Sequence, residues 1–226
     1  MRPPLSHASD AAARFVRANA ALASPPLVPE IRLHLATEIT PLWEMTEAAL
    51  DQVGLPPPYW AFAWPGSQAL ARLLLDRPAI AHGRRVLDFA AGSGLAAIAA
   101  MKAGARSAVA AEIDAYAGAA IAANAEVNGV AVEVRLADVT TQAGDWDVVL
   151  AGDVCYEKPM AERVFAWLRS LVAAGRTIYL ADPGRAYLPP GLPELARYAV
   201  PTTLELEDRK VRETRIFRLG PDQGAS

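Results

Sequence analysis

The sequence predicts an α/β protein in three layers, with a seven-stranded sheet made of five parallel strands and a C-terminal antiparallel hairpin. Two observations carry this prediction. From residue 84 onward, short apolar runs alternate with segments of helical spacing, which is the pattern of right-handed βαβ units. Towards the end of the chain the alternation stops, and two strand-like segments are separated only by Asp208 and Arg209, as in a hairpin.

Each element of the expected sheet follows from a short run of residues. The parallel strands are expected at the apolar runs, which are residues 84–90, 107–112, 132–138, 146–153 and 177–183. The hairpin strands are expected at residues 198–207 and 210–220. Helices are expected at residues 95–105, 114–129 and 158–175, the last with a proline in its first turn, where proline is tolerated.

The N-terminal part of the chain precedes the regular alternation and predicts a cover of helical and extended structure. Residues 26–42 mix prolines with an alternating stretch, which favours extended structure, and residues 43–54 have helical spacing that stops at a glycine. Three consecutive prolines exclude a regular helix over 56–67. A helix is then expected over 67–78, with Ser67 as its cap.

Length and composition favour one domain with one sizeable core. The chain has 226 residues, of which 53% are hydrophobic. We find no internal repeat, low-complexity tract or linker. The expected parts of the domain are the N-terminal cover at 1–82, the core at 83–220 and a short tail at 221–226.

Composition also disfavours several classes of function. The formal net charge is −3, so no basic excess indicates nucleic-acid binding. Cys155 is the only cysteine and the three histidines show no metal-ligand spacing, so neither a disulfide nor a metal site is expected. No apolar run reaches the roughly 18 residues of a membrane span. The N-terminus resembles an ordinary helix more than a targeting segment, so we expect an intracellular protein, cytoplasmic or, in a eukaryote, in the mitochondrial matrix.

A cofactor site is expected where the first two strands end, because open α/β sheets bind ligands beyond the carboxyl ends of their strands. The first strand ends in Asp88, and the turn after it carries Gly92 and Gly94. Glycines there let the backbone approach a ligand and lead into a helix N-terminus. The second strand ends in Glu112, whose carboxylate can accept hydrogen bonds from both hydroxyls of a ribose.

Two cofactors fit this arrangement. Residues 92–97 match the G-x-G-x-x-G/A fingerprint, and Glu112 follows Gly92 by 20 positions, as in a site for NAD. Asp88 favours S-adenosylmethionine, because its charge would repel a pyrophosphate and attract a sulfonium or ammonium group. Asp138, at the end of the third strand, could receive the adenine amine. Each residue alone is equally well explained as an ordinary turn or strand-end residue, so the argument depends on three acids at three successive strand ends.

Several stretches of the chain together resemble a known family. The whole chain is similar to Rossmann-like, seven-β-strand class I methyltransferases, and residues 29–218 resemble the lysine methyltransferases of the electron transfer flavoprotein β subunit. The matching stretches are PEIRLHL, PYWAFAWPGSQALARLLLD, RRVLDFAAGSGLAAIAAMKAGA, AEIDAYAGAAIAANAEVNG, GDVCYE and LADPGR. The glycine turn is typical of the whole superfamily, whereas the aromatic-proline segment combined with D-x-x-Y, from Asp153 to Tyr156, is far more specific.

The resemblance implies S-adenosylmethionine as the cofactor and a set of residues around it. The turn from Asp88 to Gly94, with Ala90 and Gly92, would line the methionine end, and Glu112 would hold the ribose. The other implied contacts are Trp64 from the cover, Asp138 and Val139 beside the adenine, and Gly152 at the end of the fourth strand. The family usually has a further glycine where this chain has Ala90, which leaves the backbone path of the turn open.

The resemblance also implies an acceptor site, in which a methyl group passes to the ε-amine of a protein lysine. Asp153 and Tyr156 would lie beside the transferred methyl group. We expect Asp153 to orient the amine through a charge-assisted hydrogen bond and Tyr156 to shape a narrow channel, while a plain turn capped by Asp153 is the alternative. Trp60 and Trp64 are candidates to flank the lysine stem or the cofactor, whereas Cys155 has no base near it in the sequence and is expected to be buried.

The sequence leaves other functions open beside the leading one. The leading prediction is a protein-lysine methyltransferase whose acceptor is the electron transfer flavoprotein β subunit. Within the same chemistry, the acceptor could be a ribosomal protein, such as a stalk protein, or a small molecule. Outside that chemistry, the alternatives are an NAD-dependent oxidoreductase and a catalytically silent module that binds a cofactor and docks a partner.

Overall fold

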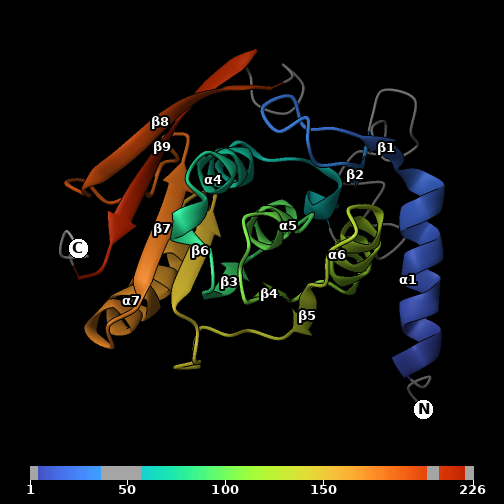
Figure 1. Cartoon of the computed structure of the whole chain (residues 1–226), viewed down its shortest axis with the longest axis horizontal. Helices are drawn as coiled ribbons and strands as arrows, with labels where there is room; N and C mark the ends of the chain where they lie inside the picture. Colours follow the sequence, from blue (N-terminus) through green and yellow to red (C-terminus); the bar gives the residue numbers. More distant parts are fainter. Residues whose placement is uncertain (1–4, 37–56, 203–208, 222–226) are drawn as a thin grey trace.

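A sheet of seven strands forms the centre of the protein, in the order β5-β4-β3-β6-β7-β9-β8 (Figure 1). The computed structural model describes residues 5–36, 57–202 and 209–221. The strands of the sheet are β3 (Arg85–Phe89), β4 (Ser107–Glu112), β5 (Glu133–Leu136), β6 (Val148–Gly152), β7 (Thr177–Asp182), β8 (Glu194–Pro201) and β9 (Val211–Leu219). The predicted α/β fold, with five parallel strands followed by an antiparallel hairpin, is confirmed.

The strand order contains a topological switch point between β3 and β6. β3 pairs in parallel with β4 on one side and with β6 on the other, so successive connections run in opposite directions from it. β9 lies between β7 and β8 and is antiparallel to both. Open α/β sheets bind their ligands beyond the carboxyl ends of the strands at such a point.

The C-terminal hairpin begins earlier than predicted. β8 starts at Glu194, ahead of the expected segment 198–207, and its pairing with β9 shifts register between Glu194 and Ala196. Leu195 packs against the core cluster that contains Val200 and Ile216, so tertiary packing extends the strand beyond its apolar run. Residues 203–208 lie outside the described part of the chain.

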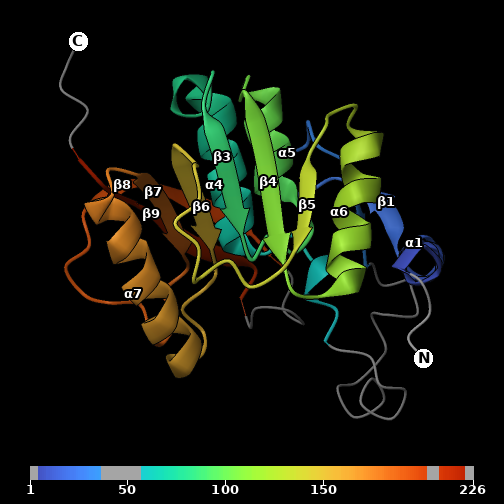
Figure 2. The same cartoon turned by 90° about the horizontal axis from the view of Figure 1, so that it is seen from below.

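Helices cover the two faces of the sheet unequally. One face carries α4 (Pro65–Asp76), α5 (Leu95–Lys102) and α6 (Ala115–Val127), and the other carries α7 (Lys158–Ala173) (Figures 1 and 2). Residues 95–100 of α5 are all buried, because this helix lies on β3 and β4 with α4 and α6 beside it. On the opposite face, Leu168 of α7 shares a core with Leu87 and Val149.

The first described part of the N-terminal cover, residues 5–36, lies against α6 and the start of α4. α1 (Leu5–Asn19) lies beside α6 (Figure 2). β1 (Ala21–Ala23) and β2 (Leu33–Leu35) form a short antiparallel pair, which confirms extended structure within the segment predicted at 26–42. The helix predicted over 43–54 falls outside the described residues.

The aromatic-proline segment leads into a helix that starts earlier than predicted. A single 3-10 turn, η1 (Tyr59–Ala61), lies within this segment, so the prediction of no regular α-helix over 56–67 holds for residues 57–64 and is wrong for residues 65–67. α4 begins at Pro65, which places Ser67 inside the first turn, and the prediction that Ser67 caps the helix is wrong. Trp64 takes the N-cap position in extended conformation, and the φ of proline, fixed near −65°, suits the first helical residue.

Neither a membrane-spanning helix nor a metal cluster is found in the part of the chain that the structure describes. No helix there is both long and apolar enough to cross a bilayer. No group of three or more His, Cys, Asp or Glu side chains there is arranged to hold a metal ion.

Candidate active site

The turn after β3 forms one wall of the site, at the carboxyl edge of the sheet. Gly92 and Gly94 take the left-handed conformation, with φ values of 53° and 78°. A Cβ at Gly94 would lie 3.0 Å from the side chain of Ile121 on α6, so the inner side of the turn is packed. A Cβ at Gly92 would meet nothing closer than the carbonyl oxygen of Tyr59 at 3.8 Å. The backbone at Gly92 is therefore the part of the turn that a ligand can approach.

Ala90 lies in the same turn, and its conformation shows which path the backbone takes there. Its φ is 52°, in the left-handed region that favours glycine. A left-handed conformation costs a residue with a Cβ about 1–2 kcal/mol. The turn thus keeps a glycine-like path at residue 90, at some cost in stability.

Two acids flank the glycine turn and are held by backbone groups. Asp88 accepts a hydrogen bond from the N–H of Ala97 at 2.9 Å, and Glu112 accepts one from the N–H of Gly92 at 2.7 Å. Burial raises the pKa of Asp88 to about 8, and the neighbouring Glu112 adds to the rise. Burial also raises the pKa of Glu112. A positively charged ligand beside these acids would favour their ionised forms.

The end of β5 differs in part from the prediction. Asp138 is exposed and accepts hydrogen bonds from the hydroxyl and the N–H of Thr140, at 2.6 and 2.9 Å, which lower its pKa. Val139 is fully buried in the core on the α7 face, so only its backbone can border a ligand. Sequence reasoning missed Ile113 and Leu136, which are 81% and 54% exposed beside Glu112 and at the end of β5. Exposed aliphatic side chains at strand ends form an apolar surface suited to a ligand.

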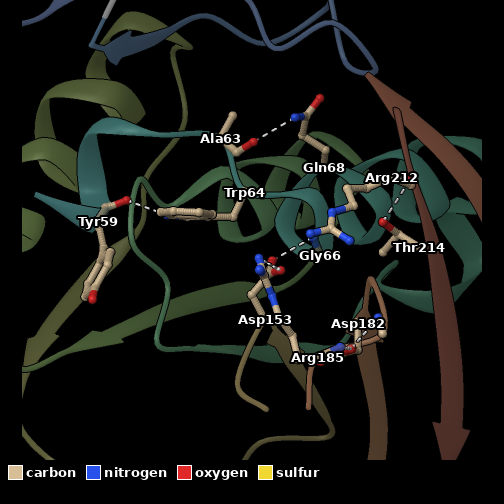
Figure 3. Close-up of polar contacts among 11 residues, drawn as sticks. Tyr59, Ala63, Trp64, Gly66, Gln68, Asp153, Asp182, Arg185, Arg212 and Thr214 are labelled. Carbon is tan, nitrogen blue, oxygen red and sulfur yellow. Dashed lines mark hydrogen bonds and ion pairs between the residues drawn. The ribbon is translucent and has the colours of Figure 1, made fainter. Parts of the chain in front are cut away.

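Asp153 follows β6 and contacts the first turn of α4. Its backbone is left-handed, with φ of 57°, and its N–H donates to the carbonyl of Ala181 at 3.0 Å. Its carboxylate accepts the N–H of Gly66 at 2.6 Å and the guanidinium of Arg185 at 3.1 Å (Figure 3). The side chain is only 11% exposed, and burial raises its pKa to about 6 although Arg185 opposes the rise. Both carboxylate oxygens therefore have partners within the chain. The sequence predicted an acid that orients the lysine amine, and it did not predict these partners.

Two glycines, Gly66 and Gly152, allow the first turn of α4 to pack directly on the ends of β6 and β7. A Cβ on Gly66 would lie 2.5 Å from Oδ2 of Asp153 and 2.9 Å from the carbonyl oxygen of Ala181. A Cβ on Gly152 would lie 3.0 Å from the backbone nitrogen of Ser67. Gly152, predicted to contact the cofactor, is thus placed where it packs against α4.

Arg185 is a residue of this site that sequence reasoning missed. Its N–H donates to Oδ1 of Asp182 at 2.6 Å, and its guanidinium lies over the ring of Trp64, 5.9 Å from the centroid. Cys155 is fully buried, as predicted, and burial followed by the nearby Asp182 raises the pKa of its thiol. The only available signal for Arg185 was its presence in the LADPGR stretch.

Aromatic side chains line the outer side of the site. Trp64 donates from Nε1 to the carbonyl of Tyr59 at 2.8 Å, and the rings of Tyr59 and Tyr156 lie 6.2 Å apart. Tyr156 is 47% exposed, so its ring faces solvent at the site. Trp60 is only 2% exposed and packs in a core cluster with Val16, so the prediction that it flanks the lysine stem is wrong.

Fold and site together define a class of protein, the class I S-adenosylmethionine-dependent methyltransferases. The strand order ends in an antiparallel hairpin, and a buried acid, Asp88, lies at the end of β3 just before the glycine turn. The residues present fit S-adenosylmethionine, because Glu112 keeps lone pairs for ribose hydroxyls and Asp88 would be stabilised by a cationic group. An NAD-dependent oxidoreductase is accordingly not favoured.

Comparisons with known proteins identify the family within this class. The chain is 35% identical over 215 residues to the electron transfer flavoprotein beta subunit lysine methyltransferase of Xenopus laevis. The aligned region covers 92% of this chain and 86% of that protein. It is 33% identical over 203 residues to the Danio rerio protein of the same name, covering 86% and 78%. The chain belongs to the electron transfer flavoprotein beta subunit lysine methyltransferase family, whose members are protein-lysine methyltransferases.

More distant similarities concern the middle of the chain and the fold. A model of the ribosomal protein L11 methyltransferase (PrmA) family matches residues 68–154. A solved structure from Pyrococcus horikoshii, assigned as an RNA methyltransferase, has a TM-score of 0.55 at 17% identity and covers 78% of this chain and 98% of that one. A methyltransferase-type protein, SMU.776, solved in complex with SAH has a TM-score of 0.52 at 11% identity, covering 71% and 50%. At these identities the likeness shows the fold.

Proposed function

We propose that this enzyme methylates a lysine of the electron transfer flavoprotein β subunit. The observation that carries the proposal is the extent of the similarity. The region aligned with the Xenopus laevis relative covers 92% of the chain, so it includes the loops after β6 and β7 as well as the glycine turn. The match to the PrmA family, by contrast, ends at residue 154 and leaves out the loop after β7, so it favours no ribosomal acceptor.

We assign the ends of β3, β4 and β5 to the cofactor and call this region the cofactor half. Asp88 and the backbone of Gly92 would hold the methionine end, and Glu112 would hold the ribose. Asp138 and two exposed apolar side chains, Ile113 and Leu136, would surround the adenine. When bound, S-adenosylmethionine supplies an electrophilic methyl group on a positively charged sulfur.

We assign the ends of β6 and β7 with the first turn of α4 to the lysine, and call this region the acceptor half. At pH 7, a lysine with the ordinary pKa of about 10.4 is neutral in roughly one molecule in 2,500. The neutral amine nitrogen forms a bond to the methyl carbon while the carbon–sulfur bond breaks and its electron pair stays on sulfur. The nitrogen then releases one proton to water.

The residues of the acceptor half would position the amine and exclude water. Asp153 can still accept a hydrogen bond from the amine, because each carboxylate oxygen has more than one lone pair. The rings of Tyr59, Trp64 and Tyr156 would confine the aliphatic stem of the lysine, and alignment of this kind supplies much of the rate of a transfer that needs little covalent help.

The proposal is tested with purified electron transfer flavoprotein and labelled S-adenosylmethionine. We expect label on the β subunit, at a lysine found by mass spectrometry, and none on its partner subunit. Purified ribosomal proteins serve as the comparison. Label on a ribosomal protein together with an unlabelled flavoprotein would overturn the proposed acceptor.

A further inference from the structure

We propose that Arg185 is a positioning residue that makes the acceptor site select the neutral form of the lysine amine. The inference rests on the proposed function, in which a protein lysine enters beside Asp153. The guanidinium of Arg185 already lies 3.1 Å from Oδ1 of Asp153, the carboxylate that an ammonium group would otherwise be expected to pair with. An entering amine therefore meets a carboxylate that is already paired with a fixed positive charge.

Arg185 is held in place from several directions. Its backbone N–H donates to the buried Asp182, its guanidinium pairs with Asp153, and the same group lies over the ring of Trp64. The loop that carries it is joined to the loop after β6, since the N–H of Tyr187 donates to the carbonyl of Cys155 at 3.1 Å. Its side chain is mostly buried, with Trp64 from the cover on one side and Asp153 from the sheet edge on the other (Figure 3).

Acidic and basic side chains offset each other around this position before any lysine enters. Asp153 and Asp182 are acids whose pKa is raised by burial, and Arg185 and Arg212 are basic, Arg212 extending from β9 towards the first turn of α4 (Figure 3). The first turn of α4 contributes backbone N–H groups and no acidic side chain. The other titratable groups near Asp153 include Cys155 and Tyr156, and Tyr156 in turn faces Tyr59, Glu157 and Glu112.

This balance penalises a cationic lysine and leaves a neutral one unaffected. An ammonium group would add a positive charge close to the guanidinium of Arg185, and a like charge within ~4–6 Å disfavours the charged form by about 1–3 pKa units. A neighbouring cation is a known way to activate a lysine amine. The residue thus raises the neutral fraction of the acceptor without removing the proton itself.

Two substitutions separate this role from a merely structural one. Arg185→Lys keeps the positive charge, and Arg185→Gln keeps a hydrogen-bond donor for Asp153 but removes the charge. We expect the pH at which kcat/KM reaches its plateau to move up by about 1 unit or more in Arg185→Gln. Its activity should then be lower by about 10-fold or more at pH 7 and approach that of the wild type at high pH. Arg185→Lys should recover most of the loss.

Binding provides a readout that does not depend on turnover. We expect the Kd for S-adenosylmethionine, measured by calorimetry, to be the same in the wild type and in both variants. In the cofactor-free state, the wild-type protein should bind the flavoprotein β subunit more tightly as pH rises, and Arg185→Gln should show a weaker pH dependence. A flavoprotein whose acceptor lysine is replaced by aminoethylcysteine, a less basic amine, should lose less activity with Arg185→Gln than the lysine protein does.

The outcomes distinguish this inference from the proposed function. An activity loss of the same size at every pH, or an Arg185→Lys variant no better than Arg185→Gln, would overturn the role of Arg185. If the wild type leaves the flavoprotein unlabelled but labels another protein in cell extract, the proposed acceptor is wrong and the pH comparison is made on that protein. If the wild type labels no protein in either assay, both proposals fail.

Discussion

The cofactor half and the acceptor half of the carboxyl edge are held together in different ways. In the cofactor half, each acid is satisfied by a backbone group near it in the sequence. Asp88 accepts from Ala97, nine positions later, and Glu112 accepts from Gly92, 20 positions earlier. The part of this half that contains Asp88 and Glu112 is a compact motif that the single unit β3-α5-β4 can build on its own.

The acceptor half joins segments that are far apart in the chain. Asp153 accepts from Gly66, 87 positions earlier, and from Arg185, 32 positions later. It exists only when the N-terminal cover, the loop after β6 and the loop after β7 come together. We therefore expect changes at this junction to abolish methyl transfer while leaving cofactor binding largely intact, and changes in the cofactor half to act through affinity and stability.

The largest effect is expected from Gly66→Ala, at the centre of the junction. The new Cβ would lie 2.5 Å from Oδ2 of Asp153 and 2.8 Å from its backbone nitrogen, so α4 must move away from the sheet. We expect transfer to fall about 100-fold or more and stability to fall by about 1–3 kcal/mol, measured by labelled methyl transfer and urea unfolding.

Gly118→Ala in α6 is the matched control for this change. Its Cβ would meet the far end of the Leu136 side chain at 2.8 Å, which can rotate away. Because Leu136 borders the proposed adenine site, the comparison is made at saturating S-adenosylmethionine, where Gly118→Ala should keep transfer close to the wild-type rate. Equal losses in the two variants would show that crowding in a helix, and not the junction, is responsible.

The second effect concerns the dependence of stability on pH through Asp88. Its pKa is raised from 3.8 to about 8 in the folded protein, so the cofactor-free protein should lose stability as pH rises between these values. Asp88→Asn has no carboxyl group to ionise and keeps an oxygen for the N–H of Ala97. We expect its free energy of unfolding to exceed that of the wild type by a few kcal/mol near pH 8, on the order set by the shift.

The difference between the two proteins should shrink towards pH 4, because the carboxyl group becomes protonated in both the folded and the unfolded state once pH falls below the unfolded pKa of 3.8. Urea unfolding at pH 4.5, 6 and 8 measures it. Parallel pH profiles for Asp88→Asn and the wild type would contradict the account of the buried acid. Asp88→Asn should also bind S-adenosylmethionine more weakly, because the cationic cofactor favours the ionised carboxylate.

The third effect is a loss of cofactor affinity in Glu112→Gln. The amide oxygen can still accept the N–H of Gly92, but the charge that strengthens bonds to ribose hydroxyls is gone. We expect the Kd for S-adenosylmethionine to rise about 10-fold, measured by calorimetry. Glu133→Gln, an exposed residue of β5, serves as the control and should leave the Kd unchanged.

The contrast between the two halves also explains what could be predicted from the sequence. The parallel sheet with its terminal hairpin and the residues of the glycine turn were predictable, because alternating patterns and a local motif encode them. The start of β8 at Glu194 was not, since packing of Leu195 extends the strand. The start of α4 at Pro65 was not predicted either. The prediction looked for a capping side chain, whereas Trp64 occupies the N-cap position with an extended backbone and no side-chain hydrogen bond.

The acceptor half was only partly predictable. Asp153 and Tyr156 were identified, but the partners of Asp153 were not, because no local pattern connects it to Gly66 or Arg185. Trp60 and Trp64 occur in one short aromatic run, and the sequence could not tell which of the two is buried. The structure separates them by placing Trp60 in the core and Trp64 under the guanidinium of Arg185.

The smallest effect is expected at Ala90, in the glycine turn. Ala90→Gly removes the steric cost of a left-handed alanine but gives the unfolded chain more freedom, and the two contributions partly cancel. We expect a gain in stability of up to about 1 kcal/mol with no change in cofactor affinity. A loss of stability in urea unfolding would show that the turn tolerates alanine without strain.

The claim that the two halves work separately is tested most directly by Asp153→Asn, with two measurements on the same protein. Asparagine keeps an oxygen for the N–H of Gly66 but loses the ion pair with Arg185. We expect the Kd for S-adenosylmethionine to stay within about threefold of the wild type while kcat/KM for the acceptor protein falls about 100-fold. Methylation at the wild-type rate, or affinity and transfer reduced by the same factor, would contradict the account.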